Sequence, residues 1–82
     1  MKKQLKTDLY GVIGLGRFGT ALVQTLAEAG KEVIAIDKNE EKVKAVRRYT
    51  DYAFVVDNLS EDALKETGMQ NCGTVTVCIG EQ

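Results

Sequence analysis

The 82-residue chain has no histidine, no proline and no tryptophan, and it has only two cysteines. Cys72 and Cys78 lack the CxxC spacing of a zinc or redox site, and no histidine is available to join them as a metal ligand. We therefore expect no metal site, and we expect both cysteines to be reduced packing residues of a cytosolic protein.

An excess of charge of one sign is also absent. The chain has 11 basic and 12 acidic side chains, so its formal net charge is -1, without the basic excess typical of nucleic-acid binding. No apolar run approaches the roughly 20 residues of a membrane span. The basic start "MKKQLKTD" is not followed by the apolar stretch of a secretory signal. We expect a cytoplasmic protein that binds no nucleic acid and does not insert into a membrane.

What the sequence does contain is a regular alternation of β-rich and helix-like runs. The predicted strands are 9–13, 33–36, 52–56 and 74–79, and the predicted helices are 18–29, 40–48 and 61–67. Strands joined through helices need crossover connections, which produce a parallel sheet with helices on both faces. We predict an α/β, Rossmann-like sheet of strand order 3-2-1-4. We expect residues 1–82 to be the truncated N-terminal half of a doubly wound domain, or a half that another chain completes.

Helical periodicity predicts which side chains face the sheet. For the first helix these are Leu22, Leu26 and Ala29, with Ala21 and Thr25 alongside, and for the second helix they are Val43, Ala45 and Val46. Asn39 and Ser60 are predicted N-caps. Gly11 has no evident role in its strand.

The stretch "GLGRFG", residues 14–19, lies between the first strand and the first helix. Gly14 permits the tight turn, Gly16 lets a phosphate approach the backbone, and Gly19 lets the helix pack closely on the sheet. The helix N-terminus then offers N–H groups to the phosphates. An ordinary strand–helix turn is the alternative, but the flanking strand and helix favour a dinucleotide site.

Asp37 ends the second strand, near the position where a dinucleotide site places an acid. Its carboxylate is expected to accept hydrogen bonds from the adenosine ribose and to repel a 2′-phosphate, which favours NAD or an adenine nucleotide over NADP. Lys38 weakens this preference over NADP, because its ammonium group can contact a 2′-phosphate if the backbone turns. The alternative is that Asp37 only ends a strand ahead of a capped helix.

Arg17 stands between the second and third glycines of the loop. We expect it to project toward phosphate and to bind it in a bidentate way. The alternative is a solvated arginine at the mouth of a cleft. Phe18 belongs to the same cofactor loop and is expected to pack inside the first helical turn without a chemical role.

Four further residues complete the predicted cofactor site. Asp57 and Asn58 follow the third strand, where amide and carboxylate groups can bond the edge of an adenine ring. A simple turn is the alternative for this pair. Ile79 and Gly80 end the fourth strand beside the first, at the topological switch point, where apolar contact and close approach to the ligand are expected.

These segments resemble the N-terminal lobe of the RCK (KTN) domain. The similarity is carried by "YGVIGLGRFGTALVQTLAEAGKEVIAIDKNEEKV", "AFVVDNLSEDALKETGM" and "VTVCIG". After the third strand the family usually has "GDAT", where this chain matches only the acid, Asp57. The resemblance implies binding of NAD(H) or ATP/ADP without catalysis, assembly into homodimers or larger rings, and ligand-dependent gating of a membrane-embedded potassium transporter or channel from the cytoplasmic side.

Two enzyme classes remain as alternatives. The cofactor-binding half of an NAD-dependent dehydrogenase has the same loop and acid, but it also needs a substrate site and an acid–base group. A flavin-binding oxidoreductase of this fold usually ends the second strand in glutamate, where Asp37 stands here. An apolar face of Val75, Val77 and Ile79 on the fourth strand also predicts pairing with another chain.

Overall fold

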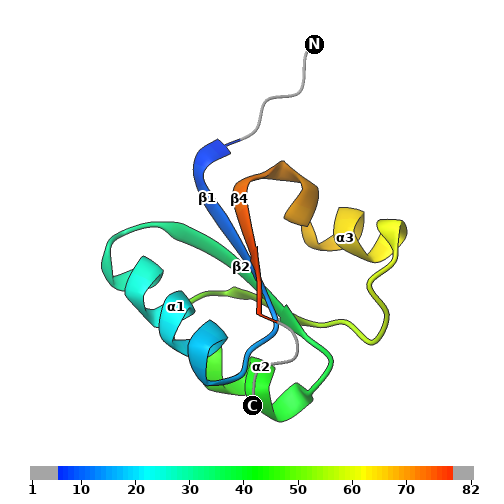
Figure 1. Ribbon diagram of the computed structural model, residues 1–82, viewed down its shortest axis with the longest axis horizontal. Helices are drawn as coiled ribbons and strands as arrows, with labels where there is room; N and C mark the ends of the chain where they lie inside the picture. The colour runs from blue at the N-terminus through cyan, green and yellow to red at the C-terminus, as the bar shows by residue number, and fades with distance from the viewer. Residues whose placement is uncertain (1–5, 79–82) are drawn as a thin grey trace.

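Strands and helices alternate through residues 6–78, the part of the chain that the computed structural model describes (Figure 1). In chain order the elements are β1 (Lys6–Ile13), α1 (Arg17–Glu28), β2 (Glu32–Asp37), α2 (Glu40–Val46), β3 (Tyr52–Val55), α3 (Glu61–Thr67), the 3-10 helix η1 (Met69–Asn71) and β4 (Cys72–Val77). The four strands form one sheet in the order β3-β2-β1-β4, with every neighbouring pair parallel. The predicted Rossmann-like α/β sheet is therefore confirmed.

Local signals explain where the helices begin and end. The Asn39 side chain accepts hydrogen bonds from the backbone N–H groups of Glu41 and Lys42, and the Ser60 hydroxyl accepts one from Ala63. Both predicted N-caps are confirmed. Gly68 ends α3 with a φ of 83°, a left-handed conformation that glycine adopts without steric cost. α2 ends at Val46, two residues before the predicted end.

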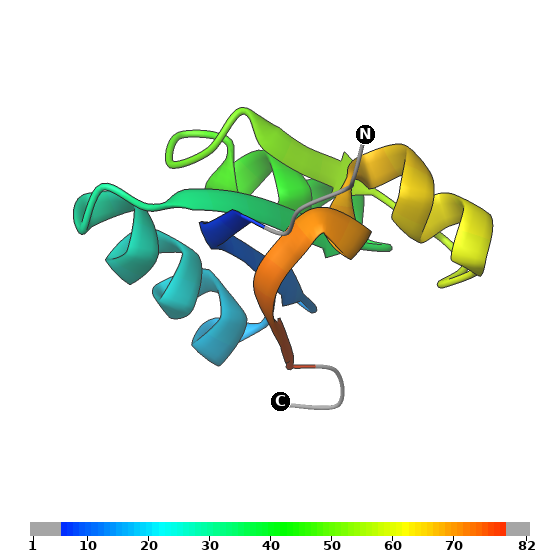
Figure 2. The ribbon, with the colours of Figure 1, turned by 90° about the horizontal axis from the view of Figure 1, so that it is seen from above.

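The sheet separates two apolar cores. α1 and α2 cover one face, whose core includes Val12, Leu15, Val23 and Val43. η1 and α3 lie over the other face, whose core includes Ile34, Ile36 and Met69. Figure 2 shows α1 and α3 on opposite sides of the strands. Because both faces are covered, β2 is apolar over four consecutive buried residues, as expected for a parallel strand.

The predicted face of α1 is confirmed in part: Leu22 and Leu26 pack against the core, but the fully buried row is a different one. Its buried residues are Gly19 and Val23, one turn apart, whereas Leu22 and Leu26 are half-buried. The other residues expected on this face, Ala21, Thr25 and Ala29, are exposed, and so is Ala45 on α2. Close approach of the helix at Gly19 turns the row containing Val23 toward the sheet, and this moves the larger leucines to the flanks.

Gly11 has a structural role that the sequence did not reveal. A Cβ atom at this position would overlap the Met69 sulfur and would lie 3.1 Å from the Cys72 sulfur and 3.3 Å from a Val75 methyl group. The glycine in β1 therefore lets η1 and the start of β4 pack directly against the strand. β4 begins at Cys72, two residues before its predicted start.

The apolar face of β4 is exposed, as the sequence indicated. Val75 is 43% exposed and Val77 is 62% exposed, and β4 is an edge strand of the sheet. Ile79, the third residue predicted on this face, lies outside the described residues. Among the described helices, none is long and apolar enough to cross a bilayer.

Candidate functional site

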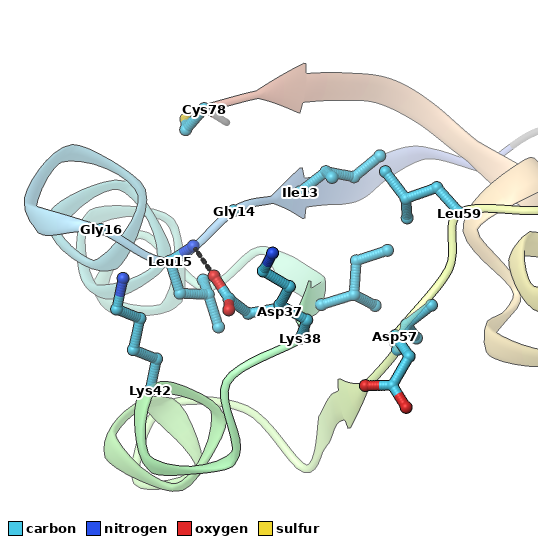
Figure 3. A pocket seen from close by; sticks show the side chains of 12 residues that line it. Ile13, Gly14, Leu15, Gly16, Asp37, Lys38, Lys42, Asp57, Leu59 and Cys78 are labelled. Carbon is cyan, nitrogen blue, oxygen red and sulfur yellow. Dashed lines mark hydrogen bonds between the residues drawn. The ribbon is translucent and has the colours of Figure 1, made fainter. Parts of the chain in front are cut away.

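A pocket of about 280 Å³ opens at the carboxyl ends of the strands (Figure 3). Ile13 ends β1, Asp37 ends β2, and Val56 follows β3, and all three residues line the pocket. Backbone hydrogen bonds hold these strand ends together: Cys78 donates to Ile13 at 2.7 Å and Val56 donates to Asp37 at 3.0 Å. Ligands of open α/β sheets bind at this edge.

The glycine loop forms the wall of the pocket next to α1. Gly14 has a φ of 99°, and its N–H donates to the carbonyl of Ile36 at 2.9 Å, so the chain leaves β1 by a turn that only glycine adopts easily. Gly16 is the N-cap of α1 and brings no side chain to the start of the helix. A Cβ atom on Gly19 would overlap the Gly14 carbonyl oxygen. The predicted close approach at Gly19 is therefore confirmed.

The Asp37 carboxylate connects this loop to the turn before α2. One oxygen accepts the N–H of Leu15 at 2.7 Å, and the other accepts the N–H of Asn39 at 2.7 Å. The dashed line in Figure 3 marks the first of these bonds. A carboxylate offers about four acceptor positions. Two remain for a ligand hydroxyl group after these backbone bonds are made.

The remaining walls combine apolar and charged side chains. Lys38 and Lys42 extend from the β2–α2 side toward the glycine loop, and Asp57 and Leu59 form the side beside β3. Leu59 is 45% exposed, which leaves an apolar surface at the mouth of the pocket. The pocket therefore offers an apolar wall, a carboxylate fixed by the backbone, and two cations.

The pocket brings together Gly14, Gly16, Asp37, Lys38 and Asp57, five of the residues predicted for the cofactor site. Arg17 is exposed on the first turn of α1 and is not among the lining residues. Asn58 lines a separate hollow between β3 and α3. Ile79 and Gly80 lie outside the described residues. Which of these residues contact a ligand stays a prediction.

The expectation that Phe18 packs inside the first helical turn is wrong. Its side chain is 63% exposed. Gly19 and Val23 are the buried residues of α1, and a neighbouring residue on a helix points about 100° away from that row. The packing of Gly19 on the loop therefore directs Phe18 toward solvent.

Several lining residues were not predicted from the sequence, chiefly Leu15, Lys42, Leu59 and Cys78. A signal for Lys42 was present: the Asn39 cap fixes the start of α2 beside Asp37, and Lys42 is the third residue of that helix. Leu15 lies between Gly14 and Gly16, which were both predicted to belong to the cofactor site, so its contact with the pocket follows from theirs.

Neither cysteine forms a disulfide within residues 6–78, and both side chains are buried. The Cys72 sulfur lies 3.9 Å from the Met69 sulfur, and burial raises the pKa of the Cys72 thiol. These properties fit packing residues. Within the described residues, no three histidine, cysteine, aspartate or glutamate side chains are grouped to hold a metal ion.

Comparison with known proteins gives a family and several relatives. The TrkA-N domain family matches residues 10–82. Ktr system potassium uptake protein C of Bacillus subtilis (strain 168) is 41% identical over 81 residues, which cover 99% of this chain and 34% of the relative. Ktr system potassium uptake protein A of the same organism is 40% identical over 77 residues, covering 94% of this chain and 35% of the relative.

A third relative, Ktr system potassium uptake protein A of Vibrio alginolyticus, is 35% identical over 71 residues, covering 87% of this chain and 32% of the relative. The chain thus spans about a third of the length of these curated relatives.

Proposed function

Because the chain belongs to the TrkA-N domain family, whose members are nucleotide-binding Rossmann-like domains, we propose that it is the nucleotide-binding regulatory part of a potassium transport system. The names of three relatives, all Ktr system potassium uptake proteins, support the link to potassium transport. In this proposal the domain binds NAD(H) or ATP/ADP, catalyses no reaction, and gates a membrane transporter or channel from the cytoplasmic side through ligand-dependent conformational change.

The observation that carries the nucleotide proposal is the Asp37 carboxylate, which bonds the Leu15 N–H at 2.7 Å at the edge of the pocket. A carboxylate anchored to the glycine loop stands at a fixed position relative to any phosphate bound there. This is the arrangement needed to hold an adenosine ribose and its 5′-phosphate together.

The proposed ligand lies across the carboxyl ends of three strands. Its phosphates approach Gly16 and the start of α1, where the helix dipole favours anions. Its ribose hydroxyls donate to Asp37, and its base lies against the apolar surface of Val56 and Leu59. Asp57 stands beside that surface, where it can accept from the base edge.

Gating requires that different ligands favour different conformations. The candidate ligands share their adenosine and differ at the phosphate end, so Asp37 holds all of them about equally. Arg17, in the first turn of α1, stands near the phosphate end and is the residue proposed to distinguish ATP from ADP.

The proposed assembly is a homodimer or a larger ring attached to the transporter. The exposed valines of β4, Val75 and Val77, support association, because an uncovered apolar edge strand favours pairing with another chain.

The test is isothermal calorimetry of the purified chain with NAD⁺, NADH, ATP and ADP. Asp37→Asn is expected to weaken all four by about tenfold or more, because a hydrogen bond to a charged group contributes about 1.5–3 kcal/mol. Asp51→Asn is the matched control, because it removes the same negative charge at an exposed position. Asp51 precedes β3 and does not line the pocket. Unchanged affinity in Asp37→Asn would exclude the ribose role.

A further inference from the structure

Two lysine side chains stand beside Asp37 in the pocket. Lys38 follows Asp37 directly, and Lys42 lies in the first turn of α2, where the Asn39 side chain accepts its backbone N–H at 3.2 Å. Figure 3 shows both lysines extending toward the glycine loop, with the Asp37 carboxylate between them in that view. Through residues 6–78, neither ammonium group forms an ion pair. Both positive charges are therefore available to a ligand.

The position of these charges relative to Asp37 suggests which part of a ligand they meet. In dinucleotide sites of this fold, an acid at the end of β2 holds the ribose 2′-hydroxyl of NAD, whereas a nearby cation accommodates the 2′-phosphate of NADP. Each oxygen of Asp37 already accepts one backbone N–H at 2.7 Å, which partly offsets its negative charge. The second carboxylate of the pocket, Asp57, stands on the side beside β3. On the side of Asp37, two cations face one partly offset carboxylate, so the local field there attracts a phosphate.

We propose that Lys38 and Lys42 form a subsite for a phosphate on the ribose 2′ position. The pocket then accepts 2′-phosphorylated adenosine ligands such as NADP(H) as well as NAD(H), so Asp37 alone does not set the preference. This inference rests on the proposed nucleotide site and names a further ligand class for it.

The experiment compares ligands that differ only in the 2′-phosphate: 5′-AMP against adenosine 2′,5′-bisphosphate, and NAD⁺ against NADP⁺, by calorimetry at constant ionic strength. The wild-type chain is expected to bind each 2′-phosphorylated ligand within about tenfold of its partner or more tightly. Lys38→Gln and Lys42→Gln are each expected to lower affinity for the 2′-phosphorylated ligands by about tenfold, the effect of losing one charge-assisted contact. Affinity for 5′-AMP and NAD⁺ is expected to fall less than this, so the affinity for the 2′-phosphorylated member of each pair decreases relative to its partner.

Lys44→Gln is the matched control. Lys44 lies on the same short helix and is exposed, but it does not line the pocket. The Lys44→Gln substitution removes the same positive charge, so it measures any general electrostatic effect of losing a lysine. Asp37→Asn tests the opposite change. It is expected to lower the affinity for NAD⁺ and to raise the affinity for NADP⁺ relative to that for NAD⁺. All variants are exposed or conservative, and circular dichroism checks that they are folded.

Three outcomes would overturn the proposal. Equal losses for all four ligands in the lysine variants would place the lysines on the shared 5′-phosphate. Normal binding of 5′-AMP and NAD⁺ with NADP⁺ bound more than about tenfold more weakly than NAD⁺ would mean that the Asp37 carboxylate sets the preference. Absence of binding by all four ligands would refute the proposed nucleotide function itself, and this subsite with it.

Discussion

Replacing Gly19 with alanine tests how closely α1 approaches the glycine loop. The added Cβ would overlap the Gly14 carbonyl oxygen. Gly14 is itself fixed, because its N–H donates to Ile36 and its φ is 99°. A backbone atom held in this way cannot rotate aside as a side chain can, so α1 must move away from the sheet to accept the methyl group.

The expected change in the free energy of unfolding is the difference between two opposing contributions. Overpacking in a well-packed interior costs about 1–3 kcal/mol. Alanine in place of glycine inside a helix recovers about 1 kcal/mol. Since the obstruction is backbone, we take the upper part of the range and expect Gly19→Ala to lower the free energy of unfolding by about 1–2 kcal/mol. For a domain of this size that lowers the melting temperature by roughly 4–16 °C.

Urea unfolding followed by far-UV circular dichroism measures this change, with Thr25→Ala as the control. Thr25 is exposed on the same helix, so its replacement should change the stability by less than about 0.5 kcal/mol. The reasoning is refuted if Gly19→Ala is more stable than the wild type by about 1 kcal/mol. That result would mean that only helix propensity changed and that the helix does not touch Gly14.

Three other substitutions test the loop and the opposite core. Arg17→Ala is expected to keep the affinity for AMP but to lose a roughly tenfold to hundredfold preference for ATP over ADP, since a charge-assisted pair contributes about 1.5–3 kcal/mol. A retained ATP preference, measured by calorimetry, would place the discrimination elsewhere. Met69→Ala should cost about 2–5 kcal/mol in urea unfolding, whereas Gly11→Ala together with Met69→Ala should cost less than the sum of the single changes, because the new methyl group fills part of the cavity. Additive effects would contradict the close packing of Met69 against Gly11.

Local chemistry made much of the fold predictable. Asn39, Ser60 and Gly68 act through bonds within a few residues, so the ends of their helices can be read from the sequence. The strand order follows because helical crossovers restrict how parallel strands are joined. The acid at Asp37 and the glycines before it are recognisable for the same reason, since the loop chemistry depends on residue type and spacing.

Features set by distant contacts were harder to predict. Gly11 is explained by Met69, Cys72 and Val75, which approach it from a different part of the chain. The exposure of Phe18 depends on which row of α1 meets the sheet, and that row is chosen by the contact of Gly19 with Gly14. Lys42 joins the pocket only once α2 is packed beside the loop. In each case the sequence pattern identifies the helix or strand, but contacts between distant parts of the chain decide which side chains are buried and which line the pocket.

The two bonds of the Asp37 carboxylate also bear on the entropy of binding. They hold the backbone N–H groups of Leu15 and Asn39 at 2.7 Å each from the carboxylate oxygens. Ordering a flexible backbone costs about 1–2 kcal/mol per residue. Here that cost is met when the chain folds, so a nucleotide encounters a preorganised loop and more of its contact energy appears as affinity. A variant that removes the carboxylate would lose rigidity at the edge of the pocket as well as the proposed ribose contact. A less favourable binding entropy, measured by calorimetry, would mark the loss of rigidity.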